Sequence, residues 1–174
     1  MTTTWISEDG EPVSKKISIF GWMRVFSRGS AIIFIILFGL ILKFVLRLFE
    51  KPLFGDRRPV TPYITVLVSK ISLWLLSIPV TRFGAPLLQP GAFVANHTSW
   101  LDIFALNSGQ SLYFVSKSEV SKWPGIGLLA KATGTLFIRR ESKEAVAQKK
   151  LVGQRIKMGH RLLFFPEGTS TDGM

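Results

Sequence analysis

The sequence predicts an α/β domain, a parallel or mixed sheet covered by helices, preceded by a membrane-embedded amino-terminal helical hairpin. Two long apolar segments occupy the first half of the chain, and proline-rich basic sequence separates them. From residue 91 onward, short apolar runs alternate with helical patterns. Strands that alternate with helices need crossover connections, which build a sheet with helices packed on its faces.

Composition points to a membrane surface as a partner. The chain has 174 residues, of which 47% are hydrophobic and only 19% charged, fewer charges than a soluble domain usually carries. Its mean hydropathy is +0.32 and its net charge +11. Because the positive charge accompanies unusual hydrophobicity, we expect an anionic membrane rather than nucleic acid. The aromatic residues lie within apolar runs, unlike a base-stacking groove. The absence of cysteine excludes disulfides, thiolate metal sites and a cysteine nucleophile.

The first two predicted domains are a tail and a membrane anchor. Residues 1–28 are expected to form a mobile tail and a juxtamembrane segment, and residues 29–82 the membrane-anchoring helices. The uninterrupted apolar run 31–42 would span roughly 18 Å as a helix, against about 30 Å of hydrocarbon. The second apolar segment, 63–80, carries Lys70 near its middle, where an ammonium is costly at mid-bilayer.

Positive charge flanks both sides of the first apolar segment. The cations before it are Lys15, Lys16, Arg24 and Arg28, and those after it are Lys51, Arg57 and Arg58. The positive-inside rule disfavours moving either side across a bilayer. We therefore expect a hairpin embedded from the cytoplasmic leaflet of the cell (inner) membrane, with the following domain on the cytoplasmic side. A single span, or a buried hairpin in the core of a soluble protein, are the alternatives.

The third predicted domain, residues 83–174, holds the sheet. Strands are expected at 91–96, 112–116, 134–140 and 161–168, and helices at 99–107, 122–133 and 141–158. Functional residues in such sheets gather at the carboxyl ends of the strands. His97 and Glu167 occupy that position, whereas His160 is expected to be a surface residue.

The stretch "NHTSWLD" contains a histidine and an aspartate that are candidates for proton transfer. Residues five apart lie roughly 140° apart on a helix, so a contact requires His97 in the preceding loop and Asp102 in the first turn. Ser99 is a suitable N-cap, and Ser99-x-x-Asp102 fits the capping-box pattern. Asp102 would orient His97, whose second ring nitrogen would take a proton from an attacking alcohol. Alternatively, Asp102 only caps the helix, and Asn96 and His97 only satisfy turn backbone.

Four motifs in order resemble the glycerolipid acyltransferases of the 1-acylglycerol-3-phosphate O-acyltransferase type. "NHTSWLD" resembles the N-H-x4-D signature of that family, and "KSEVSKWPGIG" the segment after its second strand. "GTLFIRR" resembles its G-x-x-F-I-x-R block, and "FPEGTS" its F-P-E-G-T block. The resemblance covers residues 92–170, a little under half of the chain.

The resemblance implies a role for each matching residue. His97 would be the general base and Asp102 its orienting partner. Asn96 and Ser99 would shape the turn, Arg140 would contact the acceptor's phosphate, and Lys117 would stabilise an oxyanion or a phosphate. Glu167, Gly168 and Thr169 would hold the acceptor. No metal ion and no bound organic cofactor is expected.

The implied reaction transfers a fatty acyl group from acyl-CoA or acyl carrier protein to 1-acylglycerol-3-phosphate, giving phosphatidic acid. Arg139 stands where many relatives carry aspartate, which keeps another lyso-lipid, such as lyso-ornithine lipid, open as the acceptor. The chain stops at Met174, before the family's next block, so an incomplete catalytic domain is expected. A catalytically silent, membrane-attached lipid-binding fragment is the remaining alternative.

Overall fold

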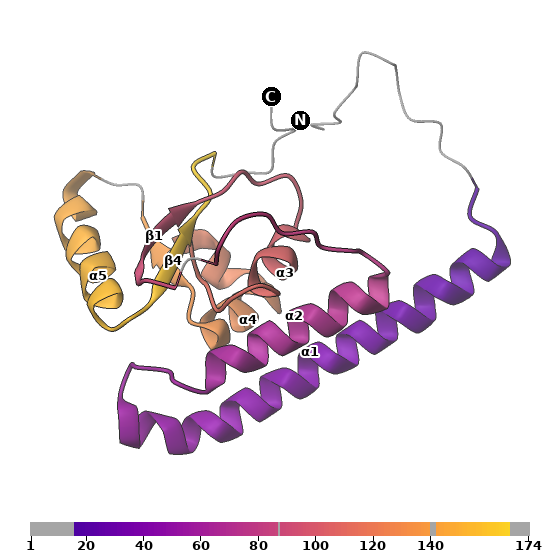
Figure 1. Ribbon diagram of the computed structural model, residues 1–174, viewed down its shortest axis with the longest axis horizontal. Coiled ribbons are helices and arrows are strands. Elements are labelled where there is room, and N and C mark those ends of the chain that lie inside the picture. Colours follow the sequence, from indigo (N-terminus) through magenta and orange to yellow (C-terminus); the bar gives the residue numbers. More distant parts are fainter. Residues whose placement is uncertain (1–15, 87, 140–141, 168–174) are drawn as a thin grey trace, which may run out of the picture.

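The computed structural model describes residues 16–86, 88–139 and 142–167. An α/β unit sits on a pair of long antiparallel helices, and the second of these helices lies between the first and the sheet (Figure 1). Residues 1–15 of the expected tail, and the predicted site residues Arg140, Gly168 and Thr169, lie outside the described residues.

The described elements confirm the predicted fold class. The strands are β1 (Gly91–Val94), β2 (Tyr113–Lys117), β3 (Leu136–Ile138) and β4 (Arg161–Phe164). The α-helices are α1 (Ile19–Phe54), α2 (Thr61–Leu76), α3 (Asp102–Asn107), α4 (Ile126–Thr133) and α5 (Ala145–Lys157). Two short 3₁₀ helices, η1 (Ser118–Lys122) and η2 (Ser142–Glu144), precede α4 and α5.

The four strands form one parallel sheet in the order β1-β4-β2-β3. The chain moves across the sheet in one direction from β1 to β2 and on to β3, and then returns from β3 to β4. Because crossovers between parallel strands are right-handed, the helix on the return path must cover the opposite face. Accordingly, α5 lies on one side of the sheet, and α3 and α4 lie on the other, next to α2 (Figure 1).

The hydrophobic core lies between the sheet and α5. Tyr113, Val115, Leu136 and Leu162 form its buried centre, and Val152 and Ile156 of α5 pack against them. Leu162 and Leu163 are 1% and 3% exposed, so β4 is covered on both faces. Such burial on both faces is typical of a strand inside a parallel sheet. The packed centre of the sheet therefore holds the ends of its strands in fixed positions.

Close packing joins α1 to α2. The Ser18 hydroxyl accepts a hydrogen bond from the Gly21 amide and caps α1, which therefore begins well before the apolar run. A Cβ atom added at Gly39 would lie 2.5 Å from Cγ2 of Val68. Glycine thus permits the close approach of the two helices, and the expected hairpin is present.

A carboxylate from α1 caps the start of α2. Val60, in the N-cap position of α2, has no polar side chain. Instead Glu50 Oε1 accepts from the amides of Val60 and Thr61 at 2.8 and 3.1 Å, and its Oε2 accepts from the Thr61 hydroxyl at 2.6 Å. These bonds satisfy amides that a helix start otherwise leaves free. Glu50 therefore fixes where the hairpin turns.

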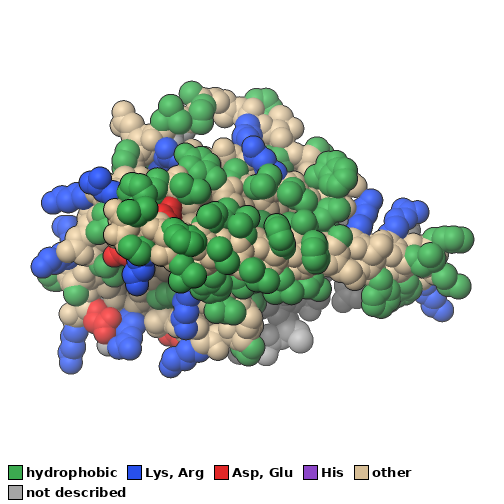
Figure 2. All heavy atoms as spheres, turned by 90° about the horizontal axis from the view of Figure 1, so that it is seen from below, with side chains coloured by type: hydrophobic (Ala, Val, Ile, Leu, Met, Phe, Trp, Pro, Cys, Tyr) green, Lys and Arg blue, Asp and Glu red, His purple; other side chains and the backbone are tan. Residues whose placement is uncertain are grey.

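The outer surface of the hairpin is apolar. Helix α1 is long and apolar enough to cross a membrane, and only 11% of its most apolar window is buried. Figure 2 shows hydrophobic side chains gathered along this underside, with lysine and arginine around its edges. A core hairpin of a soluble protein would bury these residues. The exposed apolar helix indicates membrane association.

Expectations about His160 and about the start of the last helix need correction. His160 is not a surface residue: it is 4% exposed and stacks on Tyr113, with 4.2 Å between ring centroids. It directly precedes β4, an interior strand, so the core surrounds it. The expected helix 141–158 begins later, at Ala145, because η2 occupies the preceding turn.

Candidate active site

The candidate active site begins where β1 leaves the sheet. The Ala95 amide donates to the Phe164 carbonyl at 3.1 Å, which extends the β1–β4 pairing by one residue. The chain then turns into an irregular segment up to Leu101, with Asn96 exposed and His97 half-buried. His97 therefore lies at the carboxyl edge of the parallel sheet, where functional residues gather.

The structure brings His97 and Asp102 into direct contact. The distance from His97 Nδ1 to Asp102 Oδ2 is 2.8 Å. The same oxygen accepts from the backbone amides of Thr98 and Ser99, at 2.8 and 2.9 Å. Asp102 is the first residue of α3, so the favourable end of the helix dipole also faces its carboxylate. The aspartate thus fixes both the histidine ring and the turn that carries it.

These contacts keep Asp102 ionised. Burial alone would raise the pKa of its carboxyl group. The hydrogen bonds from the Ser99 amide, the His97 ring and the Thr98 amide outweigh burial, and the pKa is lowered from its usual value. An ionised carboxylate only accepts hydrogen bonds, so Nδ1 of a neutral His97 carries its proton. Nε2 then presents a lone pair.

The second ring nitrogen is available for chemistry. Within the described residues, His97 Nε2 makes no hydrogen bond with a protein group. The His97 and Asp102 side chains are 20% and 21% exposed. Partial exposure leaves the histidine ring open to a substrate, while Nδ1 stays engaged with the aspartate.

The loop after β4 supports His97 from the other side. The ring of Phe165 stacks on the His97 ring, with 4.1 Å between centroids and 17° between planes. Glu167 Oε2 accepts a hydrogen bond from the His97 backbone amide at 2.8 Å. β1 and β4 are neighbours in register, so the segments that follow them meet at the same edge. The histidine is held at its ring and at its backbone.

Sequence reasoning missed the contact of Phe165 and assigned Glu167 only to the acceptor. The signal that could have revealed both is the pairing of the first and last strands, which places the residues after each side by side. That pairing is not visible in the periodicity of either strand.

The other predicted residues have different positions. Ser99 is not the N-cap of the regular helix, which begins later: its hydroxyl accepts from the Leu101 amide at 3.3 Å. Lys117 is exposed at the end of β2, on the same sheet edge as His97 but without a hydrogen bond to it among the described residues. Arg139 pairs with Glu144 at 3.1 Å, so its charge is partly neutralised.

Similarity to known proteins extends over both halves of the chain. A family model described as "Acyltransferase" matches residues 83–174. A lyso-ornithine lipid O-acyltransferase of Rhodobacter capsulatus is 50% identical over 170 residues, which are 98% of this chain and 61% of that protein. The protein of the same name from Pseudomonas aeruginosa is 39% identical over 117 residues, 63% of this chain and 45% of that protein.

A 1-acyl-sn-glycerol-3-phosphate acyltransferase of Neisseria gonorrhoeae is 36% identical over 92 residues, 52% of this chain and 36% of that protein. This chain therefore spans less than two thirds of the length of each of these relatives. No solved structure gives a significant match.

Proposed function

Because this chain belongs to the acyltransferase family, we propose that it transfers a fatty acyl group from a thioester to the hydroxyl of a lyso-lipid. The observation that carries the proposal is the contact between His97 Nδ1 and Asp102, which leaves Nε2 without a hydrogen-bond partner among the described residues while the histidine side chain is 20% exposed. This arrangement needs no nucleophilic serine, because the acceptor's alcohol takes that part.

In the proposed reaction His97 acts as the general base. Its Nε2 takes the proton of the acceptor hydroxyl while the hydroxyl oxygen attacks the thioester carbonyl. A carbon–oxygen bond forms, the carbon–sulfur bond breaks, and the thiol leaves after receiving the proton from the imidazolium. Asp102 stabilises the imidazolium through Nδ1–H. General-base assistance of this kind contributes about 10²–10⁴-fold.

Other residues would bind the substrates. Lys117 lies at the same strand edge and is the proposed partner of the thioester oxyanion or of a phosphate. Val94, Trp100 and Ile103 are exposed apolar residues on either side of His97 in the chain. We assign them to contact with the acyl chains. Arg140, Gly168 and Thr169 remain proposed acceptor residues on the family resemblance alone.

We propose lyso-ornithine lipid as the acceptor. Both of the more extensive similarities reported above are to proteins named lyso-ornithine lipid O-acyltransferase. The similarity to a 1-acyl-sn-glycerol-3-phosphate acyltransferase is lower and shorter. The expectation of 1-acylglycerol-3-phosphate as the main acceptor therefore gives way to the alternative drawn from the sequence.

We further propose that the catalytic domain faces the cytoplasm at the inner membrane. Cations flank the apolar part of α1 on both sides, which disfavours moving either side across the bilayer. Acyl-CoA and acyl carrier protein, the two proposed donors, would reach the site from that side.

A direct assay tests the function. The purified chain in detergent is given acyl-CoA or acyl carrier protein, with lyso-ornithine lipid or 1-acylglycerol-3-phosphate, and products are identified by mass spectrometry. We expect diacylated ornithine lipid to form faster than phosphatidic acid. Faster phosphatidic acid formation would contradict the proposed acceptor, and no product from any pair would contradict the proposed function.

A further inference from the structure

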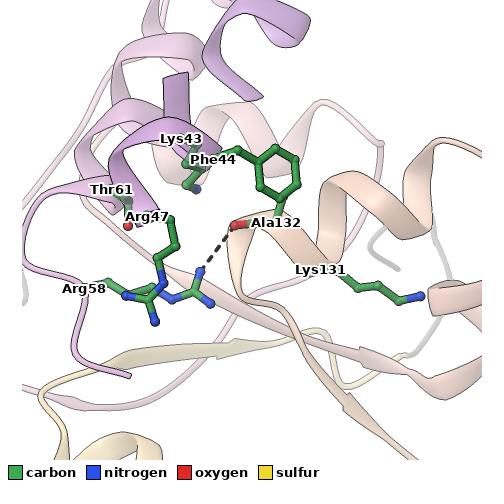
Figure 3. Close-up of a pocket in the computed structure, with 7 residues that line it drawn as sticks. All are labelled: Lys43, Phe44, Arg47, Arg58, Thr61, Lys131 and Ala132. Carbon is green, nitrogen blue, oxygen red and sulfur yellow. Dashed lines mark hydrogen bonds between the residues drawn. The ribbon is translucent and has the colours of Figure 1, made fainter. Parts of the chain in front are cut away.

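A cavity lies far from His97, where the hairpin meets the α/β unit. It has a volume of about 120 Å³ and is bounded by the second half of α1, the start of α2 and the end of α4. Its lining includes four cationic side chains, from Lys43, Arg47, Arg58 and Lys131, and one aromatic, Phe44 (Figure 3). The catalytic mechanism uses none of these residues.

The cavity faces the amino-terminal edge of the sheet. The Arg58 guanidinium donates to the carbonyl of Ala132 at 3.3 Å and lies against the turn at Gly134, which leads into β3. His97 follows the carboxyl end of β1. Because all strands are parallel, the two places lie at opposite edges of the sheet, separated along the strand direction by roughly 13 Å for a four-residue strand.

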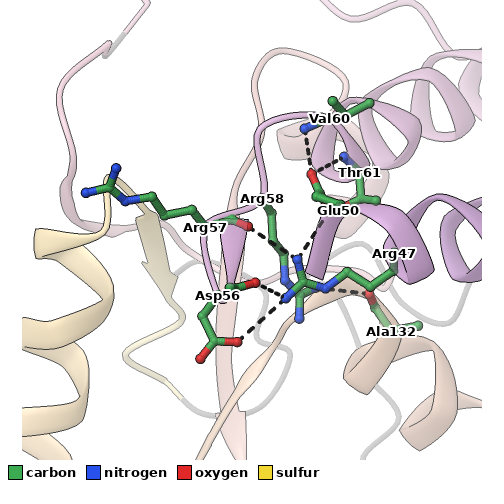
Figure 4. A network of polar contacts seen from close by, with 9 residues as sticks. Arg47, Glu50, Asp56, Arg57, Arg58, Val60, Thr61 and Ala132 are labelled. Atoms are coloured by element: carbon green, nitrogen blue, oxygen red, sulfur yellow. Dashed lines mark hydrogen bonds and ion pairs between the residues drawn. The ribbon is translucent and has the colours of Figure 1, made fainter. Parts of the chain in front are cut away.

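Arg47 is already neutralised. Its guanidinium lies 3.4 Å from the Glu50 carboxylate and 3.6 Å from that of Asp56, and it donates to the Gly55 carbonyl at 2.6 Å. This network closes the turn between α1 and α2 (Figure 4). Arg47 therefore serves the hairpin and adds little net charge to the cavity.

Lys43 and Arg58 lack a carboxylate partner among the described residues. Lys43 is 6% exposed and, in the described part of the chain, donates only to the Thr65 hydroxyl. Arg58 donates only to the Ala132 carbonyl, and its buried Nε has no hydrogen-bond partner in the described part of the chain. A buried cation without a counter-ion is costly. Burial disfavours the charged form of Lys43, so the uncompensated charge in the cavity is mainly that of Arg58, and a bound anion would offset it and favour the ammonium of Lys43.

We propose that this cavity binds a phosphate group, as the headgroup of an anionic phospholipid or as free phosphate. Phosphate offers several acceptor oxygens to the guanidinium donors of Arg58 and the ammonium of Lys43. Phe44 and the exposed apolar surface of α1 place the cavity beside the membrane-associated hairpin. Burial also lowers the pKa of Arg58, and a bound anion would offset that cost.

The test is thermal unfolding of the full chain in zwitterionic detergent. Inorganic phosphate and short-chain phosphatidylglycerol are the probes, and sodium chloride at equal ionic strength is the control. The variants are Arg58→Gln, Arg58→Lys and Lys131→Gln. Lys70→Gln is the matched control, because Lys70 is an exposed cation on α2 that does not line the cavity.

We expect the probes, but not sodium chloride, to raise the melting temperature of the wild type and of Lys70→Gln. Arg58→Gln should need at least about tenfold more probe for the same rise in melting temperature, and Arg58→Lys should recover part of this difference. Lys131 lies at the rim of the cavity, so Lys131→Gln should need about fivefold more probe for the same rise in melting temperature. Stabilisation by phosphatidylglycerol alone identifies a lipid headgroup, and stabilisation by both identifies the phosphate itself.

Two results would overturn the proposal. One is a wild type that responds to neither probe beyond the salt control. The other is an Arg58→Gln variant that responds as the wild type does. If Arg58→Gln does not fold, the exposed Lys131→Gln variant decides in the same way. The outcome is independent of acyl transfer, which the unfolding assay does not measure.

Discussion

The Asp102 carboxylate lies 2.8 Å from Nδ1 of His97, although the two residues are five positions apart. The contact exists because His97 lies in the loop before α3 and Asp102 is the helix's first residue. The amides of Thr98 and Ser99 bind the same oxygen, so the loop wraps around the carboxylate. The Asp102 side chain therefore fixes both the turn and the ring orientation of the proposed base.

The role of Asp102 as orienting partner predicts the effect of Asp102→Asn. The amide cannot carry the charge that stabilises an imidazolium, so we expect kcat for acyl transfer to fall about 10²–10⁴-fold. The Michaelis constant for the acceptor should change little, since Asp102 does not contact it. Steady-state kinetics in detergent measure both values. A near-normal kcat in Asp102→Asn would show that Asp102 only caps the helix.

Glu167 gives a prediction that separates positioning from acceptor binding. It holds the His97 backbone amide at 2.8 Å, so Glu167→Ala should lower kcat about tenfold and leave the acceptor's Michaelis constant unchanged. Glu167→Gln keeps an acceptor oxygen and should recover most of the rate. A raised Michaelis constant with unchanged kcat would instead support the acceptor role that the motif resemblance implies.

His160 predicts a pH dependence of stability. Burial first, then the charges of Arg155 and Arg58, lower the pKa of His160 from 6.5 to about 4. Between these values the unfolded chain binds the proton and the folded chain does not, so stability falls as pH falls from about 6.5 to about 4. The loss is up to about 3 kcal/mol.

His160→Phe, which keeps a ring against Tyr113, should remove this part of the pH dependence. The free energy of unfolding in denaturant, measured across that pH range, checks the prediction. Parallel pH curves for the wild type and His160→Phe would show that His160 does not titrate as its burial implies.

Glu50→Ala should destabilise the hairpin. The substitution removes the acceptor of two backbone amides and of the buried Thr61 hydroxyl, at a cost of about 2–4 kcal/mol. Lys51→Ala, at the exposed neighbouring position, is the control and should change little. Thermal unfolding in detergent compares the two. Equal melting temperatures for both variants would contradict the capping role of Glu50.

Much of this arrangement could be predicted from the sequence because it is local. The alternation of apolar runs and helical patterns predicts the order of strands and helices, and the spacing of His97 and Asp102 predicts their contact once the loop is placed before the helix. The apolar runs also predict two helices at the amino terminus. Each of these inferences uses residues that are close together in the chain.

The remainder depends on which distant segments meet. Phe165 reaches His97 only because β4 pairs with β1, and His160 is buried only because β4 lies inside the sheet. Glu50 caps α2 from another helix, so no local sequence pattern predicts this contact. Such contacts follow from topology, which the hydrophobic periodicity of single elements does not contain.

The most direct measurement is acyl transfer by a His97→Ala variant of the full chain. We predict that product formation from acyl-CoA or acyl carrier protein and lyso-ornithine lipid disappears, while binding to phospholipid vesicles stays at the wild-type level. A His97→Ala protein that folds and still forms product at the wild-type rate would contradict this prediction.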